Sequence, residues 1–291
     1  MLSITRNGVE YSLDDNTICR FISDDGTGML PMHRLSERGP LQHGISDLGY
    51  YYDPRIIMLT LAVHDTTSTA VDVKRLALMN VFAPQTDPLI LKYTLPGGDV
   101  RCIDCHFVDG LEMPHSGTGL HFKTALSLKC PDPPFYNPVA ESAVFAIGGG
   151  DDVWEVPFEV PFEVGASVID SDIAITYDGN VSTYPVIRIT GPAQNAVMTN
   201  DSLGLKLDFT GTTIAAADYY EIDLRYGRKT VTDLAGDDKL ADLTTDSDIA
   251  QWRIAADPDA PGGINSINFY CIAATAATEA ALTFYERFTG I

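Results

Sequence analysis

The stretch LHFKTALSLKCPDPPFYNP, residues 120–138, is an extended segment that ends in a proline-rich knot. Three of the four residues 131–134 are proline. Proline has no backbone N–H and a fixed φ, so neither a β-ladder nor a helix continues through such a knot. Because the residues before and after the knot also differ in composition and charge, we expect a domain boundary close to it.

The composition indicates a globular protein of two domains. The chain has 291 residues, of which 45% are hydrophobic, and a formal net charge of −21. The charge is uneven, since residues 1–150 carry 17 acids and 11 bases and residues 151–291 carry 23 acids and 8 bases. Such a surface repels phosphate, so we predict no sequence-specific binding of nucleic acid.

The sequence shows neither an apolar run long enough to span a membrane nor the basic head and apolar core of a signal peptide. We therefore expect synthesis in the cytoplasm, with the five cysteines as reduced thiols.

The first half predicts a β-rich domain, residues 1–147, with one helix. Alternating runs predict strands at 9–13 and 17–23, and the segment MLPMHRLSERGPLQHG at 29–44 predicts an exposed connection or arm. The run YYYDPRIIMLTLAV, residues 50–63, predicts one central strand, and apolar residues at helical spacing predict a helix over 71–82. A Pro-Gly-Gly-Asp turn predicts a hairpin of 89–95 with 100–110, and 120–130 is the closing strand.

The second half predicts an all-β domain. Residues 148–165 contain Pro157 and Pro161 within an alternating pattern, which indicates an edge strand or linker. Short strands separated by turn signals then recur over residues 166–291, the pattern of an antiparallel sandwich. The predicted fold class is therefore mainly β.

Cys102, Cys105 and His106, with Cys130 downstream, form the candidate set for a zinc site, because zinc binds thiolate and imidazole. His115 and His121 lie nearby in the sequence. In a strand, however, Cys102 and Cys105 point to opposite faces, and no Gly or Pro provides the knuckle turn of a structural zinc pair. Buried thiols in a hairpin explain the pattern better, so we predict no cofactor.

Other chemistries have little support in the sequence. All six histidines precede residue 122, but no G-x-S-x-G or H-E-x-x-H motif accompanies them, and we predict no enzyme. The loops at 237–238, 246–248 and 257–259 offer aspartates to calcium but no bidentate Glu, so we interpret them as turns. Tyrosines, Trp154 and Trp252 could stack on sugars, although core aromatics are commoner.

The order of motifs resembles the distal tail protein (Dit) family of siphovirus-type bacteriophages, whose tails are long and non-contractile. In the first half the resemblance rests on Gly49 with Pro54-Arg55-Ile56-Ile57-Met58-Leu59, Arg75-x-x-Leu78 followed by Phe82-Ala83-Pro84, Gly97-Gly98-Asp99-Val100-Arg101, and Asp132-Pro133-Pro134-Phe135-Tyr136. In the second half it rests on Gly179-Asn180, Tyr184-Pro185-Val186-Ile187-Arg188-Ile189-Thr190-Gly191, Pro261-Gly262-x-x-Asn265 and Phe284-Tyr285-Glu286-Arg287-Phe288. Gly263 is an extra residue relative to the family's Pro-Gly-x-Asn loop.

The resemblance implies a structural virion protein of the tail tip, assembled in the host cytoplasm. Residues 1–147 would form a β-sandwich or split-barrel-like domain that builds a homohexameric ring, and residues 166–291 a galectin-like or jelly-roll sandwich that projects outward. The ring would join the tail tube protein to the tail hub or tail-associated protein, with the tape measure protein as a further possible partner.

In the ring that the resemblance implies, an acidic lumen would let DNA pass without adhering. Arg55 and Arg75 are interface candidates, because guanidinium groups form forked pairs with carboxylates at packed interfaces; the alternative is that they are ordinary surface arginines. The alternative function is a tail-borne carbohydrate-binding module for attachment to host-surface sugars; a concave face of clustered aromatic and polar side chains in the second domain would favour it.

Overall fold

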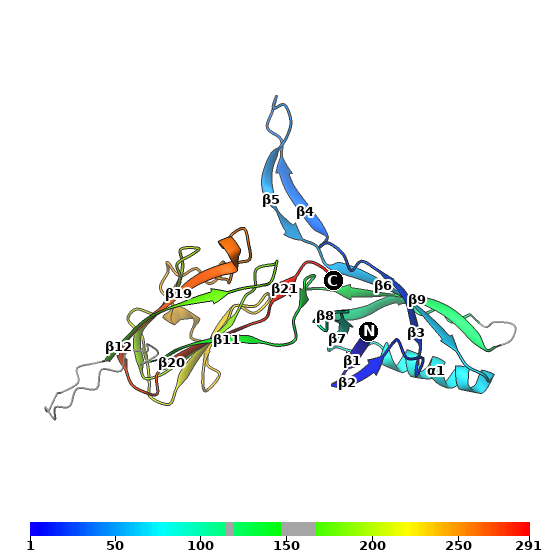
Figure 1. Ribbon diagram of the computed structural model, residues 1–291. Helices are drawn as coiled ribbons and strands as arrows, with labels where there is room; N and C mark the ends of the chain where they lie inside the picture. The colour runs from blue at the N-terminus through cyan, green and yellow to red at the C-terminus, as the bar shows by residue number, and fades with distance from the viewer. Residues whose placement is uncertain (115–118, 147–166) are drawn as a thin grey trace. The chain divides into compact units, whose positions relative to one another are not determined.

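The computed structural model describes residues 1–114, 119–146 and 167–291, which form two compact units (Figure 1). The first unit comprises Met1–Pro138 together with Phe288–Ile291, and the second comprises Val139–Arg287. The last four residues thus return to the first unit. The predicted linker at 148–165 lies outside the described residues.

The first unit contains one large β-sheet and one α-helix. Its sheet runs in the order β2-β1-β7-β8-β9-β6-β3, and β10 adds to β8. These strands are β1 (Leu2–Arg6), β2 (Val9–Ser12), β3 (Arg20–Asp25), β6 (Arg55–His64), β7 (Leu89–Thr94), β8 (Val100–Gly110), β9 (His121–Cys130) and β10 (Phe135–Tyr136). The first part of β8 pairs with β7 and its second part with β9, so two halves of the sheet share this strand.

Buried and exposed side chains alternate along β6 and β9, and the buried ones form part of the core of the first unit. The two strands pair antiparallel from Arg55↔Cys130 to His64↔His121. Ile57, Leu59 and Leu61 of β6 point inward and are fully buried. Residues 120–130 therefore form a central strand of the sheet, and the proline knot follows directly after it.

The helix α1 (Ser68–Val81) confirms the predicted helix. The hydroxyl of Thr67 accepts a hydrogen bond from the N–H of Ala70 at 3.2 Å and caps its first turn. Its inner face buries Val71, Leu78 and Val81 against the sheet. The helix ends at Val81, and its C-cap residue Phe82 lies two residues before Pro84.

The sequence predicted one strand over residues 50–63, and this prediction is wrong, because the run belongs to two strands. β5 (Ser46–Tyr52) ends before Pro54, and β6 begins at Arg55. Proline provides no backbone donor, and the N–H of Asp53 bonds to the carbonyl of Pro31, so the chain leaves one sheet and enters another here. β5 pairs with β4 (Met32–Glu37) in a separate hairpin.

The second unit is a sandwich of two antiparallel sheets, as predicted. One sheet runs β11-β20-β13-β17-β18, and the other runs β12-β19-β14-β15 with β16 on β14. The strands are β11 (Glu141–Ala146), β12 (Ser167–Thr176), β13 (Val186–Thr190), β14 (Ala193–Asn200), β15 (Leu205–Asp208), β16 (Thr213–Ile214), β17 (Tyr219–Asp223), β18 (Thr230–Asp233), β19 (Ile264–Ala274) and β20 (Glu279–Phe284). The two-residue strand β21 (Arg287–Phe288) is not part of the sandwich but pairs with β10. Short 3₁₀ turns occur at Leu240–Asp242 and Pro261–Gly263.

Between these sheets lies a core that both contribute to, including Ile187 and Ile222 from one sheet and Met198 and Phe269 from the other. Trp252 belongs to this core and is fully buried, so its ring is unavailable for stacking on a sugar at the surface. Trp154 lies outside the described residues. The predicted mainly-β class with one α-helix is confirmed for the part of the chain that the structure describes.

Candidate functional site

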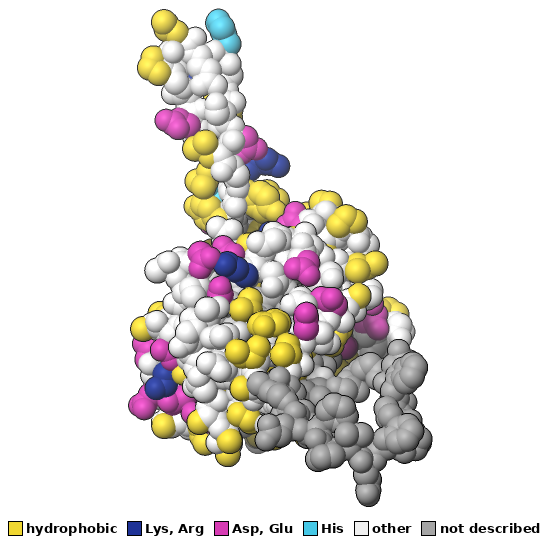
Figure 2. Space-filling model, turned by 90° about the vertical axis from the view of Figure 1, so that its left-hand side faces the viewer, with side chains coloured by type: hydrophobic (Ala, Val, Ile, Leu, Met, Phe, Trp, Pro, Cys, Tyr) yellow, Lys and Arg dark blue, Asp and Glu magenta, His cyan; other side chains and the backbone are white. Residues whose placement is uncertain are grey.

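The β4–β5 hairpin projects from the sheet of the first unit, and we call residues 29–52 the arm (Figure 1). The sequence predicted an exposed connection or arm for residues 29–44. Every residue of β4 is exposed, and β4 and β5 pair only with each other among the described residues. Figure 2 shows hydrophobic side chains near the base and at the tip of this projection. The exposed apolar residues of the arm are Met29, Met32, Leu35, Leu41, Ile45, Leu48, Tyr50 and Tyr51.

Contacts across the hairpin hold the arm in its extended form. His33 and Tyr51 stack at 5.0 Å between ring centroids, and a guanidinium nitrogen of Arg34 lies 2.6 Å from a carboxylate oxygen of Asp47. Neither outer edge of the ribbon pairs with another described strand, and such free strand edges favour pairing with another chain. The arm is therefore an apolar, edge-exposing element of the kind that an association surface requires.

The interface candidate Arg55 is 1% exposed and holds the returning C-terminus within the first unit. One guanidinium nitrogen donates to the carbonyl of Gly26 at 3.1 Å, and another donates to the carbonyl of Thr289. Its guanidinium carbon lies 4.8 Å from the centre of the Phe135 ring. Desolvation lowers the pKa of Arg55, yet a guanidinium stays protonated. Carbonyl oxygens of the same unit thus accept hydrogen bonds from both terminal guanidinium nitrogens of Arg55. Its role at an interface between subunits stays a prediction.

Arg75, the second interface candidate, lies on α1 with its side chain 13% exposed. Its guanidinium carbon stands 5.0 Å from the centre of the Phe122 ring, and one nitrogen lies 3.5 Å from a carboxylate oxygen of Asp72. These contacts fix the side chain against its own sheet. Its predicted role at a subunit interface is not tested by them.

The zinc candidates divide into separate places. Cys105 and Cys130 are fully buried, and a hydrogen bond between their thiols, together with burial, raises the pKa of Cys105. Cys102 lies on the opposite side of β8, where it pairs with Tyr136, and His106 is half-buried. Within residues 1–114, 119–146 and 167–291, no group of three or more His, Cys, Asp or Glu side chains is arranged to hold a metal ion.

The remaining histidines that the structure describes do not gather into one site. His33 and His43 belong to the arm, while His64 and His121 pair across β6 and β9. His115 lies outside the described residues. His106 lines a cavity of about 70 Å³, well below the roughly 300 Å³ at which ligand pockets begin. No described helix is long and apolar enough to cross a membrane.

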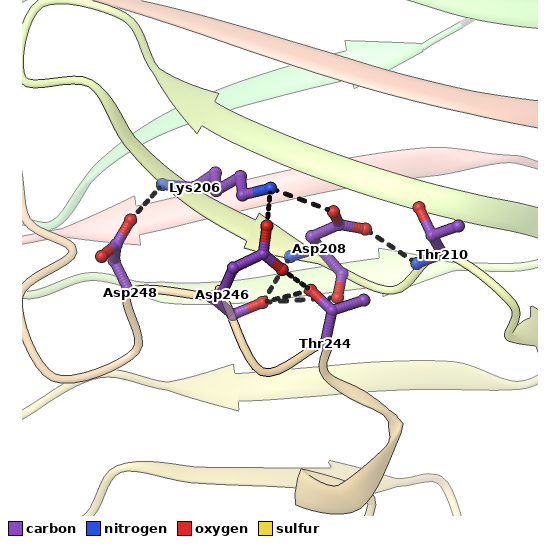
Figure 3. Close-up of polar contacts among 7 residues, drawn as sticks. Lys206, Asp208, Thr210, Thr244, Asp246 and Asp248 are labelled. Atoms are coloured by element: carbon purple, nitrogen blue, oxygen red, sulfur yellow. Dashed lines mark hydrogen bonds and ion pairs between the residues drawn. The ribbon is translucent and has the colours of Figure 1, made fainter.

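Lys206 of strand β15 binds the aspartate loop at 246–248 (Figure 3). The ammonium of Lys206 contacts Asp246 and lies 3.4 Å from a carboxylate oxygen of Asp208. The backbone N–H of Lys206 also donates to Asp248 at 3.1 Å. The Lys206 bond comes first among the causes that lower the pKa of Asp246 to about 2. The loop is thus clamped to β15 by a side-chain cation.

A further cluster, which the sequence reasoning missed, lies in the second unit where β17 ends. We call Tyr184, Arg225, Tyr226, Arg228, Lys229 and Arg253 the basic–aromatic cluster. The rings of Tyr184 and Tyr226 meet edge-on with centroids 4.7 Å apart, and their hydroxyls are 3.1 Å apart. Burial and that hydroxyl contact raise the pKa of Tyr184 to about 12. The signal in the sequence was RYGRK at 225–229, a run of bases in an acidic half of the chain.

Comparisons with known proteins place the fold. No family model matches the chain, and no curated protein sequence matches it. Among solved structures, the crystal structure of the SPP1 Dit protein, a paradigm of the hub adsorption apparatus in phages that infect Gram-positive bacteria, matches with a TM-score of 0.59. The identity is 14%, and the match covers 99% of each chain.

Two structures of the phage P2 baseplate in its activated conformation are also similar. The form with Ca has a TM-score of 0.49 at 10% identity over 98% of each chain, and the form with Sr has 0.49 at 11% over 98% of this chain and 97% of that one. TM-scores below 0.5 support no inference, so the fold assignment rests on the SPP1 Dit structure. Because that match covers 99% of this chain, the chain has the fold of the SPP1 Dit protein, and the expected resemblance to Dit is confirmed at the level of the fold.

Proposed function

We propose that this protein is a non-catalytic structural component of a phage tail tip, where six copies form a ring. The full-length likeness to the SPP1 Dit fold carries the proposal. In that ring, the first unit joins the tail tube protein to the tail hub or tail-associated protein, with the tape measure protein as a further possible neighbour. The second unit projects outward, and the protein resides in the virion.

The arm supports self-association of the first unit. An isolated two-stranded ribbon is marginally stable in water, and large apolar patches on a monomer commonly mark interaction sites. Leu48 is 60% exposed and Tyr50 is 55% exposed. Burying such side chains against a second copy removes apolar area from water at about 25 cal/mol per Å². A ring offers every arm the same neighbour.

The outer face of α1 is a second apolar surface of the first unit. Val73 and Leu76 are exposed on it, opposite the buried face of the helix. Arms on one copy and helices on the next could then contribute different surfaces to a head-to-tail contact, which closes into a ring when the rotation between copies is a simple fraction of a turn. Residues 1–150 carry a net acid excess, so a lumen formed by this unit would repel DNA rather than retain it.

The test is the mass of the purified protein in solution. We expect about six times the chain mass of 31.6 kDa by light scattering and a sixfold ring by electron microscopy. The double variant Leu48→Asp/Tyr50→Asp, and separately Leu76→Asp, should dissociate it. Val168→Asp changes a residue of similar exposure in the second unit and should leave the ring intact. A monomer at micromolar concentration contradicts the proposal, as does a ring lumen lined with Lys and Arg.

A second candidate function is sugar binding by the second unit, and the exposed Tyr226 ring beside Tyr184 favours it. Sugars commonly stack on an exposed aromatic ring while nearby polar groups bind their hydroxyls. Binding of an oligosaccharide to the wild-type chain and its loss in Tyr226→Ala would support this role.

A further inference from the structure

The basic–aromatic cluster concentrates positive charge in an acidic domain. Residues 151–291 carry 23 acids and 8 bases, and four of those bases are Arg225, Arg228, Lys229 and Arg253. Two backbone hydrogen bonds pair Thr183 with Ile254, which places Tyr184 beside Arg253. The N–H of Leu224 bonds to the carbonyl of Pro185 and brings the end of β17 to the same place.

Within the cluster, two arginines contact one carboxylate. Arg225 forms a forked pair with Asp223, with distances of 2.9 and 2.7 Å from its Nε and Nη2 to the two carboxylate oxygens. Burial alone would raise the pKa of Asp223, but the bonds from Arg225 lower it. Arg228 reaches the same carboxylate only at 3.5 Å, with its side chain 62% exposed. The Asp223 carboxylate is thus shared by Arg225 and Arg228, while Arg253 is paired with Asp259 at 3.2 Å.

Lys229 adds a charge that the described chain does not pair. Its ammonium is buried without a hydrogen-bond acceptor in that part of the chain and lies 4.2 Å from the centre of the Tyr184 ring. Burial lowers the pKa of Lys229 to about 8, so the side chain is still largely protonated at neutral pH. A buried, unpaired cation is costly for the folded protein, and an anion close by would offset that cost.

We propose that the cluster binds a saccharide that carries carboxylate or phosphate groups, with its ring against Tyr226 and its charge at Arg228. This inference rests on the second candidate function and supplies its ligand class. Arg228 provides guanidinium donors that suit carboxylate and phosphate oxygens. Tyr226 is 67% exposed and offers an aromatic surface on which a pyranose ring can stack. An acidic peptide would use the cations of the cluster but not this surface.

Calorimetry on the full chain tests the proposal with matched probes. One pair is trigalacturonate and its fully methyl-esterified form, in which a methyl ester replaces each charged carboxylate; the other is glucose 6-phosphate and glucose. Hexaglutamate represents an acidic peptide. We expect one or both charged sugars to bind at least about tenfold more tightly than their neutral partners, with the affinity falling as salt rises.

Three variants locate the binding. Arg228→Ala and Tyr226→Ala remove exposed side chains and should each weaken binding of the charged sugar by about tenfold or more. Lys229→Met should weaken it as well. Lys206→Met, which removes one cation from β15 in the other sheet, is the matched control and should bind as the wild type does.

The outcomes separate the inference from the function on which it rests. Equal binding of charged and neutral sugars overturns the charge requirement but leaves sugar binding in place. Hexaglutamate binding as tightly as the charged sugars, with no effect of Tyr226→Ala, overturns both in favour of an acidic peptide. Failure of every probe to bind also overturns both.

Discussion

The most demanding prediction concerns Arg55, which ties the end of the chain to the first unit. Replacing it by Met keeps most of the side-chain volume and removes the charge, so the carbonyls of Gly26 and Thr289 lose their donor. The face of Phe135 loses its cation. We expect Arg55→Met to loosen residues 288–291 and to destabilise the first unit selectively.

The magnitude follows from these contacts. A hydrogen bond to a charged group contributes about 1.5–3 kcal/mol, and a desolvated cation–π contact about 2 kcal/mol. Removing the charge also relieves its burial cost, which is several kcal/mol. The net loss for Arg55→Met is therefore about 2–4 kcal/mol. Arg55→Lys keeps a charge but cannot reach both carbonyls, and should lose about 1–2 kcal/mol.

Urea unfolding followed by two probes resolves the effect by unit. In a Trp154→Phe background Trp252 is the one remaining tryptophan, and it is buried in the core of the second unit, so its fluorescence reports on that unit. Circular dichroism reports on both units. The Arg55 variants should shift the dichroism transition and leave the fluorescence midpoint in place, and removal of residues 288–291 should act similarly. Arg34→Ala, on the exposed arm, is the control and should cost under about 0.5 kcal/mol.

Two results would refute this reasoning. Arg55→Met could be as stable as the wild type, which would mean that the cost of burying the guanidinium equals everything its bonds contribute. Alternatively, both probes could shift together, which would mean that the side chain does not act on the first unit alone.

Three further predictions concern local geometry. Asn265→Ala should destabilise the second unit by about 2–4 kcal/mol in urea, because its amide bonds both the N–H and the carbonyl of Ala255 in the buried core; an effect no larger than that of the partly exposed Asn268→Ala would contradict this. Gly110→Ala should cost about 2–3 kcal/mol, since φ is +97° and a Cβ would lie 2.4 Å from the carbonyl oxygen of residue 125, whereas Gly98→Ala, at φ +96° with nothing within 4 Å, should cost about 1 kcal/mol. Because the pKa of Asp246 in the folded protein is about 2, below its unfolded value, its contribution to stability should be present above about pH 4 and be lost as the pH falls through 2; Asp246→Asn should remove that part of the acid dependence, and an unchanged acid profile would count against it.

Local sequence patterns predicted the elements whose partners are close in the chain. The helix over 71–82 was predicted because its apolar spacing and Pro84 act within one element. The 89–110 hairpin was predicted because its turn residues determine the pairing of the flanking strands. The arm was predicted only as an exposed connection, since its Pro, Gly and charged residues conceal the pairing of β4 with β5.

Other elements were missed. Strand β1 was not predicted, although Asn7-Gly8 between two short runs is a strong hairpin signal and both residues have positive φ. The 50–63 run was interpreted as one strand because periodicity does not show that the two sides of Pro54 pair with different partners.

The functional residues were less accessible to sequence reasoning. Arg55 was selected as an interface residue, but its fork is filled by carbonyls 29 and 234 residues away along the chain. The RYGRK segment carries no motif, and its meaning depends on Tyr184 and Arg253, which other parts of the chain bring beside it. The tertiary packing brings these segments together in space, and local sequence patterns do not show it.

Composition, local spacing and the order of motifs along the chain were enough to predict the mainly-β class and the helix, and to show the acid excess and the resemblance to the distal tail proteins. Three features became visible only in the folded protein: the arm is an apolar ribbon that pairs with no other described strand, Arg55 holds the C-terminus, and the ammonium of Lys229 is buried over Tyr184. The physical reason is that burial and long-range pairing fix the surroundings of a charge, and those surroundings decide whether it supports the fold or remains for a partner.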